Sequence, residues 1–425
     1  MRRARGLRGS IALALVTVAA VGGVTLGTPA GTHGAVLSVP LTAGPLPSAG
    51  CSWFGETDQR DVNIGAPDLD AFYWLSPLTP SLGARDVITG SYPHARYFSF
   101  HVYDNQGNAL GSIYDQQIAP DRGSANPFRG RVRRGRGDRF TAYVSFEPRP
   151  SRPAPDTVYV SPAAAGDAAL LVYRVYVPAH PTVPSGDVPF PQVRQETGSG
   201  QTLTALGACA TTPPPFGSVF WQAAASEDYP AGAPVPANGA ATRIPTWQRS
   251  FGNQLGNQQN AYLVTTLSRQ YGDLVVLHAR APTFPNSRAG QPVYGRHQLR
   301  YWSLCTYDAS GQAGFGCAAD YVAPIRSGSI TYVVSDPGTR PANATAAHGV
   351  AWLPWGAQPA VQLVYRNMLP ATWFAHAVQR VKPSSSVPKV LGAYYPSAVY
   401  CAPATFGRGG WRACFAAAGL RTGRS

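Results

Sequence analysis

Apolar and polar side chains alternate in several short stretches of the chain, most clearly over residues 96–103. Successive side chains of a β-strand point to opposite faces of the sheet. The pattern therefore predicts a strand with one face packed into a core. That face carries Phe98, Phe100 and Val102 together with Arg96, and the opposite face carries Tyr97, Ser99, His101 and Tyr103.

The alternating stretch occurs twice. Residues 95–104 resemble residues 299–308, and three further pairs of segments match in the same order along the chain. Self-similarity that keeps its order indicates an internal duplication. The further matches join 70–72 with 260–262, 140–145 with 330–335, and 171–174 with 363–366.

The 45 glycines and 40 prolines, with frequent Tyr, Val and Thr, favour short strands joined by tight turns. The sequence thus predicts a mainly β protein with two tandem, internally duplicated antiparallel β-sandwich units, jelly-roll-like, and few short helices. Helical stretches are expected at 219–226 and at 258–270, the latter ended by Gly272. The expected divisions are a first unit at 51–180, a Pro/Gly-rich connector at 181–256, a second unit at 257–380 and a tail at 381–425.

The N-terminus has the layout of a secretory signal peptide. Arginines at positions 2, 3, 5 and 8 precede an apolar run over residues 11–26, and small residues follow at 28–30. Residues 1–30 are therefore predicted to direct export and to be removed. The alternative is a retained membrane anchor, for which the run is short. We expect a secreted or extracytoplasmic, envelope-associated protein without a transmembrane span after signal removal.

The chain contains six cysteines, and an even number in an exported protein predicts three disulfides. Spacing suggests two pairs, because one flanks Gly311 symmetrically, as in a hairpin, and another brackets a glycine-rich turn at residues 407–410. The remaining two cysteines pair by elimination. No spacing typical of a metal site occurs, so no metal and no cofactor is predicted. The predicted pairs are Cys51 with Cys209, Cys305 with Cys317, and Cys401 with Cys414.

The formal net charge is +14, and nearly all cationic side chains are arginines. Many of them gather within residues 128–140, a stretch that the second unit lacks. As an exposed loop, this stretch would attract anionic polymers, phosphate-bearing glycans or, without sequence specificity, nucleic acid. The alternative is a solvated flexible loop. The candidate polymer-binding residues are Arg131, Arg133, Arg134 and Arg136.

Arginine also recurs at equivalent positions of the two units. A guanidinium group binds carboxylate or phosphate, which makes these arginines candidates for ligand binding, with Tyr301 beside them. The structural alternative is favoured: each arginine pairs with an acid of its own unit, such as Asp104 or Asp308, or holds a loop. The four arginines are Arg96, Arg300, Arg174 and Arg366.

Trp352 and Trp355 lie in a Pro- and Gly-containing segment before the last strand of the second unit. Tryptophans on a loop can form a platform for sugar rings. The first unit has residues 160–163 at that place, without an aromatic, so any such site belongs to the second unit. The alternative is that the two rings anchor the loop by burial.

Several short motifs stand out beside these features, at residues 92–97, 120–124, 126–128, 280–285, 352–356 and 366–370. At these motifs the chain resembles a group of secreted actinobacterial proteins of uncharacterised function, over most of residues 50–380. It is also distantly similar to paired β-domain proteins of unknown function in bacteria. The resemblance implies export and a β-rich fold, and it implies no reaction.

The sequence has no nucleophile elbow, no HExxH motif, no Walker loop and no dinucleotide fingerprint. The leading hypothesis is therefore a non-catalytic protein that binds a glycan or an anionic envelope polymer. One alternative is a secreted hydrolase with a site between the two units. Another is a structural surface protein.

Overall fold

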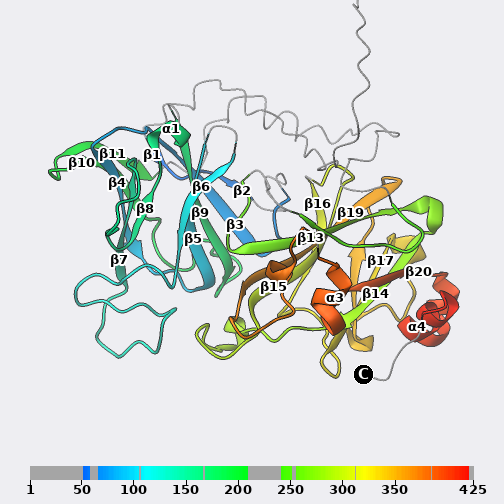
Figure 1. Cartoon of the computed structure of the whole chain (residues 1–425). Helices are drawn as coiled ribbons and strands as arrows, with labels where there is room; N and C mark the ends of the chain where they lie inside the picture. Colours follow the sequence, from blue (N-terminus) through cyan, green and yellow to red (C-terminus); the bar gives the residue numbers. More distant parts are fainter. Residues whose placement is uncertain are drawn as a thin grey trace, which may run out of the picture. The chain divides into compact units, whose positions relative to one another are not determined.

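Four β-sheets account for most of the residues that the structure describes (Figure 1). Two sheets come from residues 51–208, called here the first half, and two from residues 241–420, the second half. Both halves fall within one compact part of the chain. The prediction of a mainly β protein with few helices is confirmed. The computed structural model describes residues 51–57, 66–104, 107–165, 168–208, 241–250, 255–311, 313–383 and 385–420.

The first half contains a six-stranded and a five-stranded sheet. The six-stranded order is β1 (Cys51–Ser52), β11 (Thr202–Ala208), β10 (Gln192–Thr197), β4 (Ala84–Ser91), β7 (Arg139–Ser145) and β8 (Thr157–Tyr159). The five-stranded order is β2 (Phe54–Thr57), β3 (Ala71–Leu78), β9 (Ala169–Pro178), β5 (Ala95–Tyr103) and β6 (Ala109–Tyr114). Neighbouring strands are antiparallel except in the parallel pairs β1–β11 and β7–β8.

The second half contains a five-stranded and a four-stranded sheet. The five-stranded order is β12 (Gln248–Ser250), β13 (Asn260–Ser268), β19 (Ala360–Pro370), β15 (Leu299–Tyr307) and β16 (Gly314–Ala319). The four-stranded order is β18 (Val350–Pro354), β17 (Ser329–Ser335), β14 (Leu274–Arg280) and β20 (Ser397–Tyr400). Among the strands described in this half, β17 and β18 pair in parallel and the other neighbours are antiparallel.

The two five-stranded sheets correspond strand by strand. In both, the sequence-matched segments 95–104 and 299–308 form the strand next to the edge, paired on one side with a long strand and on the other with a short hairpin partner. The registers also agree. Equivalent opposite residues are Ser99 with Arg174 and Ser303 with Arg366, and His101 with Ser112 and Cys305 with Cys317.

Each half has a large apolar cluster with side chains from both of its sheets. Phe98 and Phe100 of β5 pack against Phe140 of β7, and Trp302 of β15 belongs to the same cluster as Tyr332 of β17. The predicted apolar face of residues 96–103 is therefore confirmed. Burying one such aromatic side chain contributes about 1.5–3 kcal/mol.

Short helices complete the structure. The α-helices described are α1 (Pro162–Ala165), α3 (Val387–Leu391) and α4 (Pro403–Ala417). The 3-10 helices described are η1 (Arg269–Tyr271), η2 (Ser287–Ala289), η3 (Pro337–Thr339), η4 (Ala346–His348), η5 (Val378–Arg380) and η6 (Gly392–Tyr394). No helix among the described residues has the length and apolar content needed to cross a bilayer.

Two local predictions are wrong. The expected helix over residues 258–270 is strand β13 followed by η1, because its residues pair with β12 and β19 and bury Ala261, Leu263 and Leu267. Gly272, with φ 144°, closes η1 instead. The expected turn at residues 407–410 lies inside α4, which is kinked at Gly410 (φ 60°).

Segments expected to connect the units also join the sheets. Within residues 181–256, β10 pairs with β4, although its sequence is mainly polar, and β11 pairs with β10. From the tail, β20 pairs with β14 and α4 packs Phe406 and Phe415 onto the apolar cluster around Leu274.

Two of the predicted disulfides are present. Cys305 and Cys317 lie directly opposite each other in β15 and β16, with Gly311 at φ 74° in the intervening turn. Cys401 and Cys414 join the end of β20 to α4. Three further predictions concern residues outside the described part of the chain. They are the disulfide of Cys51 with Cys209, the signal segment at 1–30 and the helix at 219–226.

Candidate functional sites: the charged layer and the arginine loop

Charged side chains of both halves are buried where the halves meet. Ion pairs there join residues of one half to residues of the other. A buried charge is costly unless a partner of opposite charge compensates it. We call this set of residues the charged layer: Asp68, Arg96, Asp115, Arg174, Arg300, Asp320 and Arg366, each at most 5% exposed.

Two ion pairs cross between the halves reciprocally. Nη1 of Arg96 donates to Oδ1 of Asp320, and Nη1 of Arg300 lies 3.2 Å from Oδ2 of Asp115. Each acid is held by its own half, since the backbone N–H of Trp302 donates to Asp320 at 3.1 Å and that of Phe98 donates to Asp115 at 3.2 Å. Burial raises the pKa of Asp320 to about 6, although Arg96 lowers it in part.

The repeated arginines were expected to pair with an acid of their own unit or to hold a loop. The first expectation is wrong, because the acids paired with Arg96 and Arg300 belong to the other half, whereas Arg174 and Arg366 do hold a backbone segment. Asp104 instead accepts hydrogen bonds from Asn108, and Asp308 accepts one from Ser310, so both acids hold their own turns. The acids that do pair with Arg96 and Arg300 follow β16 and β6 directly, at equivalent places in the two five-stranded sheets. Extending the sequence match beyond the turns would have revealed this repeated aspartate.

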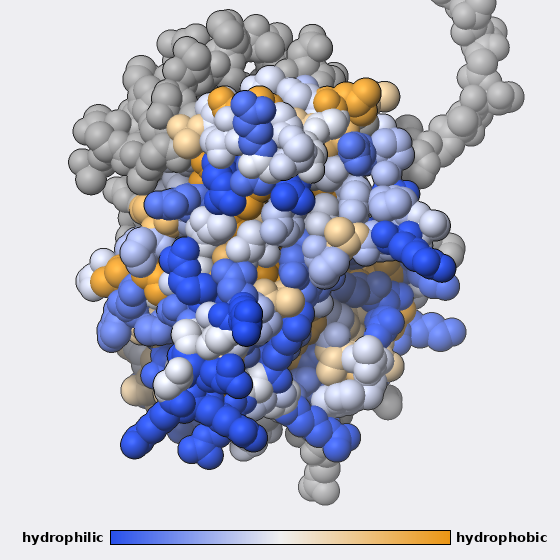
Figure 2. All heavy atoms as spheres, turned by 90° about the vertical axis from the view of Figure 1, so that its left-hand side faces the viewer, coloured by the Kyte–Doolittle hydropathy of each residue, from blue (hydrophilic) through white to orange (hydrophobic). Residues whose placement is uncertain are grey.

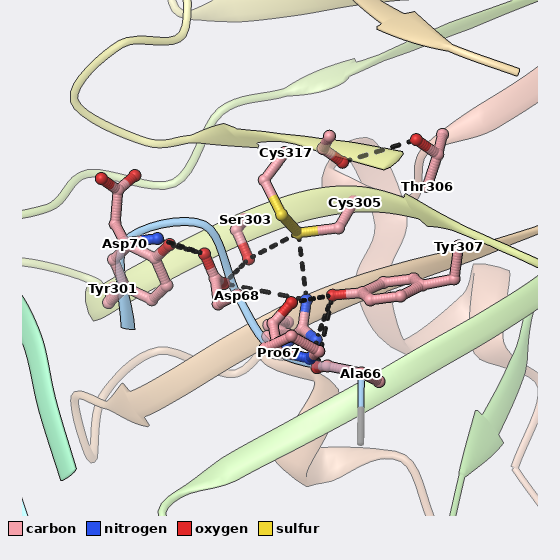
Figure 3. The surroundings of a disulfide bond; sticks show 12 residues. Ala66, Pro67, Asp68, Asp70, Tyr301, Ser303, Cys305, Thr306, Tyr307 and Cys317 are labelled. Atoms are coloured by element: carbon pink, nitrogen blue, oxygen red, sulfur yellow. Dashed lines mark hydrogen bonds and ion pairs between the residues drawn. A yellow bond between two sulfur atoms is a disulfide. The ribbon is translucent and has the colours of Figure 1, made fainter. Parts of the chain in front are cut away.

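Asp68, which precedes β3 in the first half, reaches into the second half beside the Cys305 disulfide (Figure 3). Its Oδ1 accepts from the hydroxyl of Tyr301 at 2.7 Å, and its Oδ2 accepts from Oγ of Ser303 at 2.5 Å. Nη1 of Arg366 lies 3.7 Å from the same Oδ2. The adjoining backbone is fixed as well, because Nη2 of Arg366 donates to the carbonyl of Ala66 at 2.6 Å.

The first half has the matching arrangement around Arg174. Nη2 of Arg174 donates to the carbonyl of Leu255 at 2.6 Å, and the hydroxyl of Tyr103 donates to the carbonyl of Gly256 at 2.7 Å. Leu255 and Gly256 precede β13 as Ala66 and its neighbour precede β3. Each half therefore extends a short segment onto the five-stranded sheet of the other.

Ser99 and His101 of β5, beside the charged layer, place a hydroxyl close to an imidazole nitrogen, at 3.2 Å between Oγ and Nδ1. Both side chains are 0% exposed. Burial lowers the pKa of His101 well below its usual value, and Arg174 lowers it further. A substrate has no access to these two groups in this conformation, so their arrangement gives the hydrolase hypothesis no support.

The segment with the two tryptophans was expected to be a loop, but Trp352 lies within strand β18, paired with β17, and Trp355 follows that strand directly. Trp355 is 0% exposed, and the guanidinium of Arg269 stacks on its ring at 5.1 Å from the centroid. Trp352 is half-buried, donates from Nε1 to Oγ of Ser335 at 3.1 Å, and carries Arg340 over its ring at 4.6 Å. The burial of Trp355 agrees with the alternative that the rings anchor this segment, whereas part of the Trp352 ring is exposed to solvent.

The arginine loop, residues 129–139, precedes and enters β7 in the first half (Figure 1). It contains six arginines and one acid, Asp138. Its base is fixed, because Nδ2 of Asn126 donates to the carbonyls of Asp115 and Ile118 at 2.7 and 2.8 Å. Arg129 donates to two further backbone carbonyls at 2.6 Å.

Beyond this base the loop is exposed to solvent. Figure 2 shows that hydrophilic side chains predominate toward the lower end of this face of the molecule. A hollow of about 370 Å³ opens here, and its walls include four guanidinium-bearing side chains. The lining residues are Pro120, Ser124, Ala125, Asn126, Arg129, Arg131, Arg133 and Arg136. Arg134 belongs to the same exposed loop but does not line the hollow.

The structure thus separates the residues suggested by the sequence into three places. The repeated arginines and Tyr301 lie in or beside the charged layer, the tryptophans lie at β18, and the remaining arginines lie in the arginine loop. Among them, the arginine loop alone combines several exposed cationic side chains with a concave surface.

No family model matches the chain, and no curated protein matches it either. Among solved structures, an uncharacterised protein from Burkholderia cenocepacia is similar with a TM-score of 0.44 and 14% identity, over 79% of this chain and 81% of that one. The VPA0106 protein from Vibrio parahaemolyticus is similar with a TM-score of 0.40 and 11% identity, over 80% of this chain and 91% of that one. The structural neighbours are thus distant bacterial proteins, and their names assign no activity to this chain.

Proposed function

We propose that this chain is an exported, non-catalytic protein that binds an anionic polymer of the cell envelope through the arginine loop. The observation that carries the proposal is the hollow lined by Arg129, Arg131, Arg133 and Arg136. Guanidinium groups bind phosphate and carboxylate in a bidentate manner, and several in one loop suit a repeating anionic chain. Binding of this kind is largely electrostatic and weakens as salt increases.

The anchoring of the loop supports a binding role over that of a purely solvated segment. Asn126 and Arg129 fix its base by hydrogen bonds to backbone carbonyls, which reduces the conformational entropy lost when a polymer binds. Arg131, Arg133, Arg134 and Arg136 remain exposed. Their charges are therefore available to a ligand from solvent.

Charge rather than sugar stacking supplies the recognition in this proposal. Trp355 is buried under Arg269, and Trp352 offers only part of its surface. A neutral glycan would thus find little aromatic surface at β18. The polymer we propose carries phosphate or carboxylate groups at regular spacing.

We infer further that each half is a β-sandwich, that both descend from one duplicated unit, and that the chain is exported. Equivalent strand orders and registers in the two five-stranded sheets support the duplication. Disulfides at Cys305 and Cys401 support an oxidising location outside the cytoplasm.

The proposal is tested by binding of the full-length protein to immobilised polyphosphate and to a polyuronate. A variant in which Arg131, Arg133, Arg134 and Arg136 are changed to glutamine should bind at least about tenfold more weakly at low salt and show a smaller salt dependence. The matched control removes four exposed charges elsewhere in the chain. It changes Arg243, Lys382, Lys389 and Arg408 to glutamine, and its affinity should remain near that of the wild type.

Equal losses in the two variants would contradict the proposal, because net charge rather than the loop would then govern binding. Absence of binding to either polymer above an unrelated basic protein would also contradict it. Turnover of a substrate by the purified protein would instead favour the hydrolase alternative.

A further inference from the structure

The two halves present equivalent arginines that differ in their charge compensation. In the second half, Arg366 has a carboxylate, Asp68, which also accepts hydrogen bonds from Tyr301 and Ser303. The equivalents of these three residues in the first half are Arg174, Tyr97 and Ser99. The fourth residue differs, since an amide, Asn257, stands there: its Oδ1 lies 3.2 Å from the hydroxyl of Tyr97, which also lies 2.8 Å from Oε1 of Gln259.

The orientation of the Asn257 amide follows from its contacts. Its Oδ1 also accepts from the backbone N–H of Gln259 at 2.9 Å, and a backbone N–H can only donate. From the matching registers of the two halves, we infer that the other amide atom, Nδ2, takes the place of Oδ2 of Asp68, the oxygen that faces Arg366 in the second half. A hydrogen-bond donor thus stands where the other half has an acceptor.

Several buried hydrogen-bond donors of Arg174 and Asn257 have no acceptor among the described residues. They include Nδ2 of Asn257 and both Nε and Nη1 of Arg174, whose side chains are 4% and 2% exposed. The hydroxyl of Ser99, which also lies within hydrogen-bond reach of the Tyr97 hydroxyl, is a further donor. Because Nε2 of His101 accepts from the backbone N–H of Gln258 at 3.1 Å, Nδ1 of His101 carries the proton that faces Oγ of Ser99.

The charge of Arg174 is equally uncompensated. No described acid forms an ion pair with it, and the rings of Tyr73 and Tyr103 lie 5.5 and 5.3 Å from its guanidinium. Burial raises the pKa of both tyrosines above the usual value, so their hydroxyls are neutral at physiological pH. Leaving such an arginine buried without an anion would be strongly destabilising.

We propose that Arg174, Asn257 and Ser99 bind a small monovalent anion of the size of chloride, which replaces the carboxylate that Asp68 supplies in the other half. The anion accepts from the guanidinium, the Nδ2 group and the serine hydroxyl. The deep burial of these donors selects a small ion over phosphate or a polymer. This site is independent of the arginine loop, which lies on the exposed surface.

The test compares thermal unfolding of the full-length protein in sodium chloride and in sodium gluconate at equal ionic strength, since gluconate is too large for the site. The wild type should unfold a few degrees higher in chloride, and the difference should saturate with chloride concentration. The variant Asn257→Asp restores the missing carboxylate. It should be as stable in gluconate as the wild type is in chloride, and it should show no difference between the salts.

Two further variants identify the source of any chloride effect. Asn260→Asp adds a carboxylate to another buried asparagine, one that donates to Tyr176, and should lower the unfolding temperature in both salts while keeping the chloride difference. Glutamine at Arg131, Arg133, Arg134 and Arg136 should also keep it. Loss of the chloride difference in this loop variant would overturn the proposal.

Other outcomes would overturn it as well. If chloride gives no stabilisation of the wild type, a neutral water molecule satisfies the donors. If Asn257→Asp unfolds, is destabilised or retains the chloride difference, Arg174 does not need an anionic partner there. Crystals grown in sodium bromide give a direct check: an anomalous peak is expected within hydrogen-bond distance of Arg174 in the wild type and none in Asn257→Asp.

Discussion

Asp86 on β4 shows how a single buried carboxyl group sets a pH dependence. It is 4% exposed, and its Oδ2 has no hydrogen-bond partner among the described residues. Burial raises its pKa to about 7, and a hydrogen bond with Gln195 offsets only part of that effect. Because the folded protein retains a proton that the unfolded chain loses near pH 4, stability falls as pH rises from about 4 to 7.

We therefore expect Asp86→Asn to raise the free energy of unfolding at pH 8 by about 2–4 kcal/mol and to have little effect at pH 4. Urea unfolding at the two pH values measures the difference. The exposed Asp138→Asn serves as control and should shift neither value. An equal gain at both pH values would show that the effect of Asp86→Asn does not come from titration.

The ion pair between Arg96 and Asp320 illustrates the asymmetry between losing one charge and losing two. Both side chains are 0% exposed, so Arg96→Met leaves Asp320 buried without its cation. This change should lower the free energy of unfolding by about 3–5 kcal/mol. The double variant Arg96→Met with Asp320→Asn removes both charges and should recover part of that loss, because asparagine can still accept from the backbone of Trp302. Additive losses in a double-mutant cycle from urea unfolding would contradict this coupling.

A disulfide bridge attaches helix α4 to the sheets of the second half. Cys414 of α4 is joined to Cys401 at the end of β20, which pairs with β14. In the loop-entropy model such a bridge contributes about 3 kcal/mol. We expect Cys401→Ala with Cys414→Ala to accelerate amide hydrogen exchange in α4, while exchange in β5 stays unchanged. Unchanged protection of α4 would show that the packing of Phe406 and Phe415 is sufficient to hold it.

The elements that could be predicted are those whose side chains repeat with the period of a strand. Strand β5 and the disulfide hairpin of β15 and β16 follow from alternation and from symmetric cysteine spacing around Gly311. Strand β10 could not be predicted, because its sequence is polar and the pairing with β4 determines its conformation. The repeated aspartates after β6 and β16 could have been found in the sequence. Their pairing with Arg300 and Arg96 could not, because side-chain alternation does not show which residues of the two halves meet.

At the scale of the whole molecule, the halves hold each other through reciprocal contacts. Arg96 pairs with Asp320 while Arg300 pairs with Asp115, and the segments before β3 and β13 each contact the five-stranded sheet of the other half. Without the other half, each half would contain buried charged side chains that have no partner of opposite charge. The charged layer therefore makes the folding of each half depend on the other, in addition to any role of the individual side chains.

This dependence predicts that the two halves unfold in one cooperative transition. Phe98→Ala in the first core and Leu304→Ala in the second should each lower the midpoint of a single calorimetric transition, with losses of about 2–5 kcal/mol, because both side chains are fully buried. If the halves were independent, the thermogram would contain two transitions, and each substitution would move only the transition of its own half. Adding Arg300→Met to either variant should separate the transitions, because it removes one of the two reciprocal ion pairs and leaves Asp115 buried without its partner. A thermogram of the wild type that already resolves two transitions would show that the charged layer binds the halves together without coupling their folding.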